Sequence, residues 1–147
     1  MKTIRNYLFL LLTVVVLTAC DDNDGNDIRP DQVPGTVLTT FTQMFPDATV
    51  KEWEQYGSRY KVECYQQGKE TEVWFEADGT WKRTETDYRE PLPEAVQNYV
   101  TKNYAGYHVE DVDWVEVPNH AYFETELEKG DRYEFVLLIR PDGMPMN

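Results

Sequence analysis

Serine, histidine and cysteine are scarce in this chain of 147 amino acids. There is one serine, Ser58, in a predicted turn with no nucleophile motif around it, and there are two histidines. His108 and His120 flank one predicted strand without a familiar metal-ligand spacing, so a shared site would need carboxylates such as Glu110 or Asp111. No glycine-rich phosphate loop is present. The sequence therefore predicts a protein that is not an enzyme, with no cofactor and no metal site.

Basic residues are also few. The chain has 14 Lys and Arg against 27 Asp and Glu, which gives a net charge of -13. Binding to a phosphate backbone requires clustered basic residues, and an anionic lipid surface would repel an acidic body. Nucleic acid is therefore excluded as a partner, and any membrane attachment should depend on a lipid anchor.

Only one long apolar run occurs, from Tyr7 to Val16, and it is short for a membrane span. Lys2 and Arg5 precede it, and Leu17-Thr18-Ala19-Cys20 follows. This order resembles the signal sequence and lipobox of bacterial lipoproteins, in which the chain is cut before the cysteine and the sulfur carries a diacylglycerol. The resemblance implies a signal peptide over residues 1–19 and lipidation of Cys20. An uncleaved N-terminal membrane helix is the alternative.

An acidic segment follows Cys20. Residues 21–32 are rich in Asp, Asn and Gly and nearly free of apolar side chains, which predicts a flexible tether over residues 20–32. Acidic residues at this place resemble the surface-export signal of Bacteroidota lipoproteins, which implies the outer membrane and the cell surface. An aspartate after the cysteine also resembles the inner-membrane retention signal of enterobacteria. Both localisations within the cell envelope stay open.

If Cys20 carries lipid, Cys64 has no partner for an internal disulfide. It lies in the segment Tyr60 to Tyr65, where apolar and polar side chains alternate as in a strand with one buried face. Tyr60, Val62 and Cys64 share one face, and Lys61, Glu63 and Tyr65 share the other. The pattern predicts that Cys64 is a buried, inert thiol.

The remaining chain contains an internal repeat, over residues 33–90 and 91–147. Each copy opens with an apolar residue and a proline, Val33-Pro34 and Leu92-Pro93, followed by an amphipathic helical pattern. Predicted strands follow each helix. In the first copy they cover residues 49–55, 60–66, 71–77 and 80–86, and in the second copy residues 109–117, 121–128 and 133–140.

The two copies differ in spacing. The number of residues from Tyr60 to Gly68 equals the number from Tyr122 to Gly130, but the segment that follows is two residues longer in the second copy. Tyr122, Glu124 and Glu126 share one face, which is more acidic than its counterpart. We therefore expect a β-bulge or a changed facing of the strands in the second copy.

Several motifs follow one another in the first copy, including Phe45-Pro46-Asp47-Ala48, Tyr60-Lys61-Val62-Glu63 and the segment Glu72 to Trp81. They are similar to the β-lactamase-inhibitor-like, PepSY-like domain of Bacteroidota lipoproteins, over about residues 33–143. The resemblance implies an α+β fold of two tandem repeats, each with one helix packed on an antiparallel β-sheet. It also implies a concave sheet surface like the one with which the inhibitor protein grips β-lactamase. Fold alone does not fix function.

An outward-facing group of aromatic and acidic residues is the candidate partner-binding face. If Val73 and Phe75 face the helix, Trp74 points outward between two acids, and Tyr65 lies outward on the neighbouring strand. Aromatic rings give large contact area, and flanking acids favour a partner with Lys or Arg. The set comprises Tyr65, Trp74, Glu63, Glu72 and Glu76. The alternative is that these rings pack at the junction between the repeats.

The leading hypothesis is a lipid-anchored, non-enzymatic envelope protein that binds a protein or peptide across its open sheet face, where the acidic residues favour a basic partner. One alternative is an envelope protein that binds a small ligand or a metal, which would need a pocket with converging polar groups. A structural surface lipoprotein is the other alternative.

Overall fold

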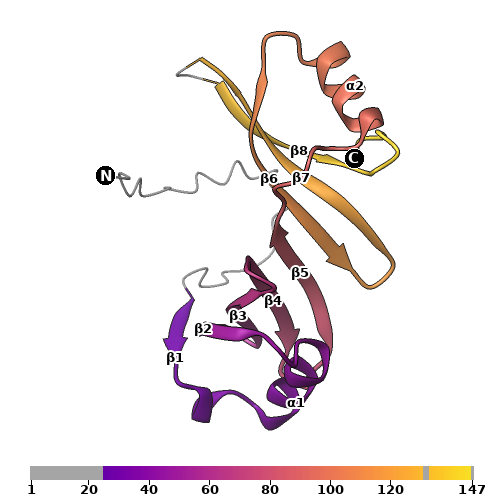
Figure 1. The fold of residues 1–147 in the computed structure, drawn as a ribbon. Helices are drawn as coiled ribbons and strands as arrows, with labels where there is room; N and C mark the ends of the chain where they lie inside the picture. The colour runs from indigo at the N-terminus through magenta and orange to yellow at the C-terminus, as the bar shows by residue number, and fades with distance from the viewer. Residues whose placement is uncertain (1–24, 131–132, 147) are drawn as a thin grey trace.

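The computed structural model describes residues 25–130 and 133–146, and the predicted signal peptide and Cys20 lie outside this range. Eight strands form one antiparallel sheet in which every strand pairs with its neighbours in sequence (Figure 1). The first half contains β1 (Asn26–Ile28), β2 (Thr49–Tyr56), β3 (Arg59–Gln66), β4 (Lys69–Glu76) and β5 (Trp81–Asp87). The second half contains β6 (His108–Val117), β7 (His120–Lys129) and β8 (Tyr133–Ile139). The α+β class is therefore confirmed.

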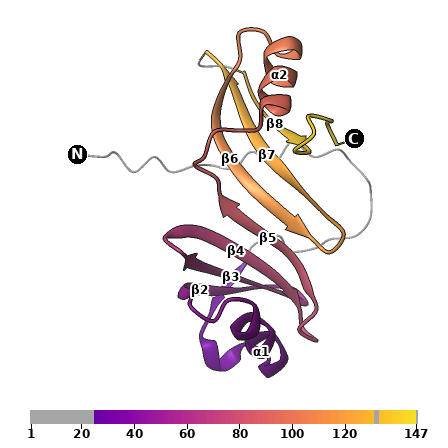
Figure 2. The same cartoon turned by 45° about the vertical axis from the view of Figure 1, so that its right-hand side comes forward.

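Two helices cover one face of the sheet. Helix α1 (Gly35–Met44) precedes β2, and helix α2 (Glu94–Asn103) connects β5 to β6. A proline stands at each N-cap, Pro34 and Pro93, with a φ angle near the value that its ring imposes. Figures 1 and 2 show α1 over the first half of the sheet and α2 over the second. None of the described helices is both long enough and apolar enough to pass through a membrane.

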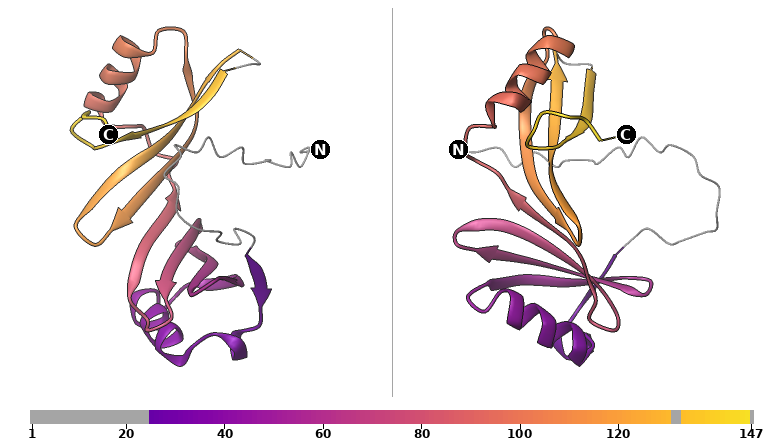
Figure 3. Two further views of the ribbon diagram at one scale, coloured as in Figure 1. Left: turned by 180° about the vertical axis from the view of Figure 1, so that it is seen from behind. Right: turned by 90° about the vertical axis from the view of Figure 1, so that its right-hand side faces the viewer.

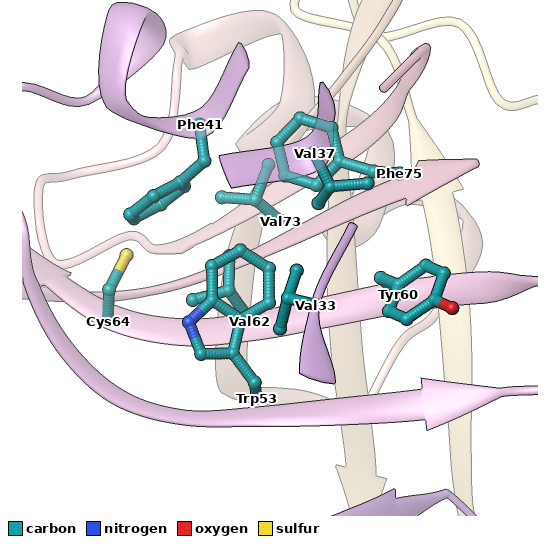
Figure 4. Close-up of a cluster of buried hydrophobic side chains, with 9 residues drawn as sticks. All are labelled: Val33, Val37, Phe41, Trp53, Tyr60, Val62, Cys64, Val73 and Phe75. Carbon is teal, nitrogen blue, oxygen red and sulfur yellow. The ribbon is translucent and has the colours of Figure 1, made fainter. Parts of the chain in front are cut away.

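Each helix packs on its own cluster of buried side chains. Under α1, Val37 and Phe41 contact inward-facing residues of β2, β3 and β4, as Figure 4 shows. The Trp53 ring lies edge-on to Phe41, with 5.4 Å between the ring centroids. Under α2, Val96 and Val100 pack on residues of β6, β7 and β8. The buried Cys64 belongs to the first cluster, and burial raises the pKa of its thiol to about 11, as expected for an inert cysteine.

The halves meet where β5 pairs with β6. Four residue pairs form this ladder, from Thr84↔Glu116 to Asp87↔Asp113. Thr86 is paired with Trp114, and Trp114 packs against the α2 cluster, so the sheet is continuous and both helices lie on the same face. The strands of the two halves run in clearly different directions because the sheet twists, which Figure 3 shows from two further sides.

The segment predicted as a tether is in part ordered. Asn26–Ile28 forms β1 and pairs with Gln55, Glu54 and Trp53 of β2. Ile28 packs against the α1 cluster, and a 3-10 turn over Pro30–Gln32 leads into the helix. The prediction of a flexible tether is therefore wrong for residues 26–32. A single apolar side chain and a free sheet edge are enough to order this polar segment, and composition alone does not reveal either.

The expected change of facing in the second half is present. Tyr60 faces the helix, whereas Tyr122 lies on the opposite face and Phe123, Thr125 and Leu127 face α2. The position of each tyrosine along its strand accounts for this difference. Two residues connect β2 to β3 and also β6 to β7, but Tyr60 is the second residue of β3 whereas Tyr122 is the third residue of β7. Successive residues of a strand point to opposite faces, so a shift of one position changes the facing.

Candidate functional site: the helix-free face of the sheet

The face of the sheet opposite the helices is lined by charged side chains. Along each strand, the residues that alternate with the core positions point to this face. Register places Glu52, Glu63, Glu72 and Glu85 side by side across β2 to β5. Asp113 and Glu124, which pair with each other on β6 and β7, lie on the same face, where Asp113 is also paired with Asp87 of β5. The helix-free face is therefore strongly acidic across both halves.

Lys61 lies in the first half of this face and is only 7% exposed. Its Nζ is 2.8 Å from Oε2 of Glu54, 2.8 Å from Oε1 of Glu63 and 3.8 Å from Oε2 of Glu72. Burial by itself would lower the pKa of Lys61, but the hydrogen bonds to Glu54 and Glu63 raise it above the ordinary value. Lys61 is therefore a permanent cation that holds three carboxylates together.

Two aromatic rings enclose the Lys61 ammonium. The Tyr56 and Trp74 ring centroids are 4.9 Å apart, and Lys61 Nζ lies 5.7 Å from the first and 5.9 Å from the second. The Tyr56 hydroxyl donates a hydrogen bond of 2.7 Å to Glu54. Burial and this bond raise the pKa of Tyr56 to about 12. Trp74 is therefore partly covered, and its ring serves the Lys61 cluster as well as the surface.

Tyr65 is the more accessible aromatic residue, at 40% exposed. Its hydroxyl donates a hydrogen bond of 2.9 Å to Glu70, and Lys51 Nζ lies 5.5 Å from the ring centroid. Lys51 also forms ion pairs with Glu63 at 3.6 Å and Glu70 at 3.3 Å. This corner of the face therefore offers an open ring between acidic groups.

At the centre of the face, carboxylates outnumber cations. Arg83 pairs with Glu85 at 2.7 Å and with Glu124 at 2.6 Å. Burial, together with nearby carboxylates, raises the pKa of Glu85 to about 7 and that of Asp113 to about 6. Burial is also the main cause that raises the pKa of Glu72. These groups bind protons more tightly than free carboxylates because burial disfavours their charged forms and, to a smaller extent, nearby carboxylates repel them.

The residues predicted from the sequence all lie on this face. Glu63 and Glu72 are directly paired, and Tyr65 and Trp74 belong to adjacent strands. Glu76 lies at the far end of β4, 3.6 Å from Lys82, and is separated from the Lys61 cluster. Sequence reasoning missed Tyr56, Lys61 as a buried cation, and the central group of Arg83, Glu85 and Asp113. Extending the alternation through β5 and β6 would have placed Arg83, Glu85 and Asp113 on this face, but not beside one another.

The two histidines do not share a site. His108 and His120 stand at opposite ends of β6 and β7, and His120 stacks on Tyr122 with 5.9 Å between the ring centroids. Ser58 is exposed in the β2–β3 turn. The hydroxyl and imidazole groups therefore do not assemble a nucleophile and a base within the described residues.

A cleft of about 350 Å³ lies at the junction of the two halves. Tyr88, Trp114 and Phe123 line it, with 4.9 Å between the centroids of Tyr88 and Phe123 and also between those of Trp114 and Phe123. An ion pair of 2.7 Å between Lys69 and Glu90 stands at the cleft. Thr86, Asp87 and Pro141 complete the lining beside these aromatic rings.

Comparison with known proteins gives a consistent family assignment. The sequence profile described as "Putative beta-lactamase-inhibitor-like, PepSY-like" matches residues 21–68 and 58–143. No curated protein matches the chain.

Several solved structures are similar to this one. A BLIP-like protein from Bacteroides fragilis is 31% identical, with a TM-score of 0.68 over 78% of this chain and 84% of that chain. A protein from Bacteroides ovatus, from a family without an assigned function, is 30% identical, with a TM-score of 0.70 over 80% and 86%. A Bacteroides eggerthii protein described as periplasmic is 25% identical, with a TM-score of 0.70 over 78% and 86%. From the eight-stranded antiparallel sheet, the two helices on one face and these matches, the chain belongs to the β-lactamase-inhibitor-like, PepSY-like family.

Proposed function

We propose that this chain is a non-enzymatic, lipid-anchored envelope protein whose helix-free face binds a basic protein or peptide. The observation that carries the proposal is the excess of carboxylates at the centre of that face. Glu72, Glu85 and Asp113 are partly buried, and burial, with a further contribution from the repulsion of neighbouring carboxylates, raises their pKa values. A Lys or Arg side chain from a partner would relieve this repulsion and gain charge-assisted hydrogen bonds.

The edge of the face supplies the apolar contact that such binding needs. Tyr65 is exposed beside Glu70, and Trp74 borders the same row of acids. Aromatic side chains close to charged groups are typical anchors at protein interfaces. The partner is therefore expected to combine basic residues with an apolar segment.

The test compares, at pH 8, two variants in each of which three acidic residues are replaced by neutral amides. In the face variant, Glu72→Gln, Glu85→Gln and Asp113→Asn neutralise the centre of the helix-free face. In the control variant, Asp47→Asn, Glu94→Gln and Glu116→Gln neutralise three exposed acids on the helix side. We expect the face variant to lose at least tenfold in affinity for an Arg-rich peptide in calorimetric titration, and to lose the partners that the parent captures by crosslinking in envelope fractions. Equal binding by both variants would refute the proposed face.

Lipid attachment is tested separately. Metabolic labelling with an alkyne-tagged fatty acid should mark the protein, and Cys20→Ala should abolish the label and move the protein from the membrane fraction to the soluble fraction. Cys64→Ala is the matched control, since Cys64 is buried in the α1 cluster. A label that persists in Cys20→Ala would contradict the anchor.

We also propose that the two halves are diverged copies of one unit. Each helix follows a proline N-cap, and the first strand after each helix carries a bulge, between Val50 and Glu52 and between Val109 and Asp111. In both halves a glycine with positive φ, Gly79 or Gly143, packs on the first turn of the helix. These shared irregularities support duplication better than shared regular elements do.

A second candidate function is the binding of a small aromatic ligand in the cleft between the halves. The cleft volume of about 350 Å³ and its aromatic lining are in the usual range for small-molecule sites. Quenching of Trp114 fluorescence by a ligand, abolished in Phe123→Ala and retained in the face variant, would favour this function.

A further inference from the structure

A histidine and two glutamates come together at one end of the β6–β7 hairpin. His108 is paired with Glu128 across the ladder. Glu110 lies in the bulge between Val109 and Asp111, where the strand has one residue without a counterpart on β7. Bulges change the direction of side chains, and here the bulge brings Glu110 beside His108.

The distances within this cluster are those of metal ligands. His108 Nε2 is 3.5 Å from Oε2 of Glu110 and 3.4 Å from Oε2 of Glu128. Both distances exceed the 2.7–3.2 Å that is typical of a hydrogen bond with an N–H donor. Two ligand atoms bound to one tetrahedral zinc ion, each about 2.0–2.2 Å from the metal, are about 3.3–3.5 Å apart. The ligand atoms of all three residues lie within 4.8 Å of one another, so one ion could contact them with small side-chain movements.

At the equivalent bulge in the first half, a lysine side chain lies where the metal ion would lie in the second half. There the bulge residue is Lys51, whose ammonium lies between the carboxylates of Glu63 and Glu70. In the second half the bulge residue is Glu110. Among the described residues, His108 is the only basic side chain that pairs with Glu110 or Glu128. The nearby Lys129 instead lies against Tyr107 and the carbonyl of Ala105.

We propose that His108, Glu110 and Glu128 form a binding site for one divalent transition-metal ion of the zinc class. One imidazole nitrogen and two carboxylate oxygens suit Zn²⁺, Ni²⁺ or Cu²⁺ better than Ca²⁺ or Mg²⁺, which prefer oxygen alone. The side chains are 59%, 50% and 30% exposed, so water can complete the coordination. The site is independent of the proposed partner-binding function.

The test uses tag-free protein and the metal ion alone. Calorimetric titration with Zn²⁺ should give one site per chain, and His108→Ala should weaken it at least a hundredfold. Glu128→Gln and Glu110→Gln should each weaken it about tenfold, consistent with the loss of one ligand. His120→Ala is the matched control because it removes the other histidine, at the opposite end of the hairpin, and should bind like the parent.

A second readout identifies the ligand directly. On addition of Zn²⁺, the imidazole NMR signals of His108 should shift at one equivalent while those of His120 stay in place. Thermal melts confirm that each variant is folded, as expected for exposed positions. The proposal is overturned if the parent binds no Zn²⁺, if His108→Ala binds as the parent does, if both histidine variants lose binding equally, or if Ca²⁺ displaces Zn²⁺ at equal concentration.

Discussion

At the scale of single residues, Lys61 has the largest influence on the helix-free face. It is a buried ammonium on a surface of carboxylates, and it contacts Glu54, Glu63 and Glu72 at once. Removing one partner of a buried ion cluster leaves the other charges without compensation. Lys61 therefore offsets the repulsion between the carboxylates of β2, β3 and β4, which allows these acidic strands to pair in one sheet.

We expect Lys61→Met to lower the free energy of unfolding by about 3 kcal/mol, because three carboxylates lose their shared cation while the packing volume is nearly kept. Urea denaturation at pH 7 measures the effect. Lys82→Met removes an exposed lysine from β5, two strands away, and should change stability by less than about 0.5 kcal/mol. Adding Glu54→Gln and Glu63→Gln to Lys61→Met should recover most of the loss; no recovery would show that the effect is one of packing.

Sequence reasoning predicted the facing of Lys61 but not its burial. Alternation along Tyr60 to Tyr65 is a local property, so it places Lys61 on the helix-free face and Cys64 in the core, and both placements are confirmed. The burial of Lys61 depends on Tyr56 and Trp74, which belong to two other strands. Contacts between strands require the register of the sheet, and local alternation does not supply it.

At the scale of elements, the two helices and the strands from β2 to β8 follow closely from periodicity, prolines and glycine turns. The exceptions have physical causes that the local pattern does not contain. β1 forms because a sheet edge is available to a polar segment, and Tyr122 faces away from the helices because it stands one position further along its strand than Tyr60 does. The centre of the candidate site was missed because it depends on the pairing of β5 with β6 across the intervening helix α2.

The turn between β4 and β5 packs against helix α1, and this makes Gly79 sensitive to substitution. Gly79 has a φ of 87°, and a Cβ there would lie 2.8 Å from the backbone oxygen of Thr36 in α1. We expect Gly79→Ala to destabilise the protein by about 2–4 kcal/mol, because backbone strain and a clash with a helix carbonyl add together.

Two matched glycines separate these causes. Gly68 also has a positive φ, of 81°, but a Cβ there would meet nothing within 4 Å, so Gly68→Ala should cost only about 1–2 kcal/mol. Gly35 has neither constraint, and Gly35→Ala should be neutral or slightly stabilising. Thermal melts of the three variants rank their losses of stability. Equal losses of stability in Gly79→Ala and Gly68→Ala would contradict the clash with Thr36.

At the scale of the whole molecule, the acidic face makes stability depend on pH. The pKa of Glu85 is about 7 and that of Asp113 about 6, both above the values of unfolded carboxyls. Between about pH 4 and pH 7 the folded state therefore holds more protons than the unfolded state. These two groups make the protein most stable below this range and less stable as the pH rises through it.

We expect Glu85→Gln to stabilise the protein at pH 8 by on the order of 2 kcal/mol and to have little effect at pH 4.5, where the carboxyl is protonated in the folded state. Urea denaturation at both pH values measures the difference. Glu116→Gln, on the helix side of β6, is the control and should leave the pH dependence unchanged. A stabilisation of equal size at both pH values would point to packing instead of charge.

The narrow β5–β6 ladder has a mechanical consequence for the molecule. Four residue pairs join the halves, and the Arg83–Glu124 ion pair, from β5 to β7, spans this seam. A basic partner that binds Glu124 would compete with Arg83 for this carboxylate and weaken the ion pair between the halves. Partner binding and the angle between the two halves are then coupled, so that binding of the partner changes this angle.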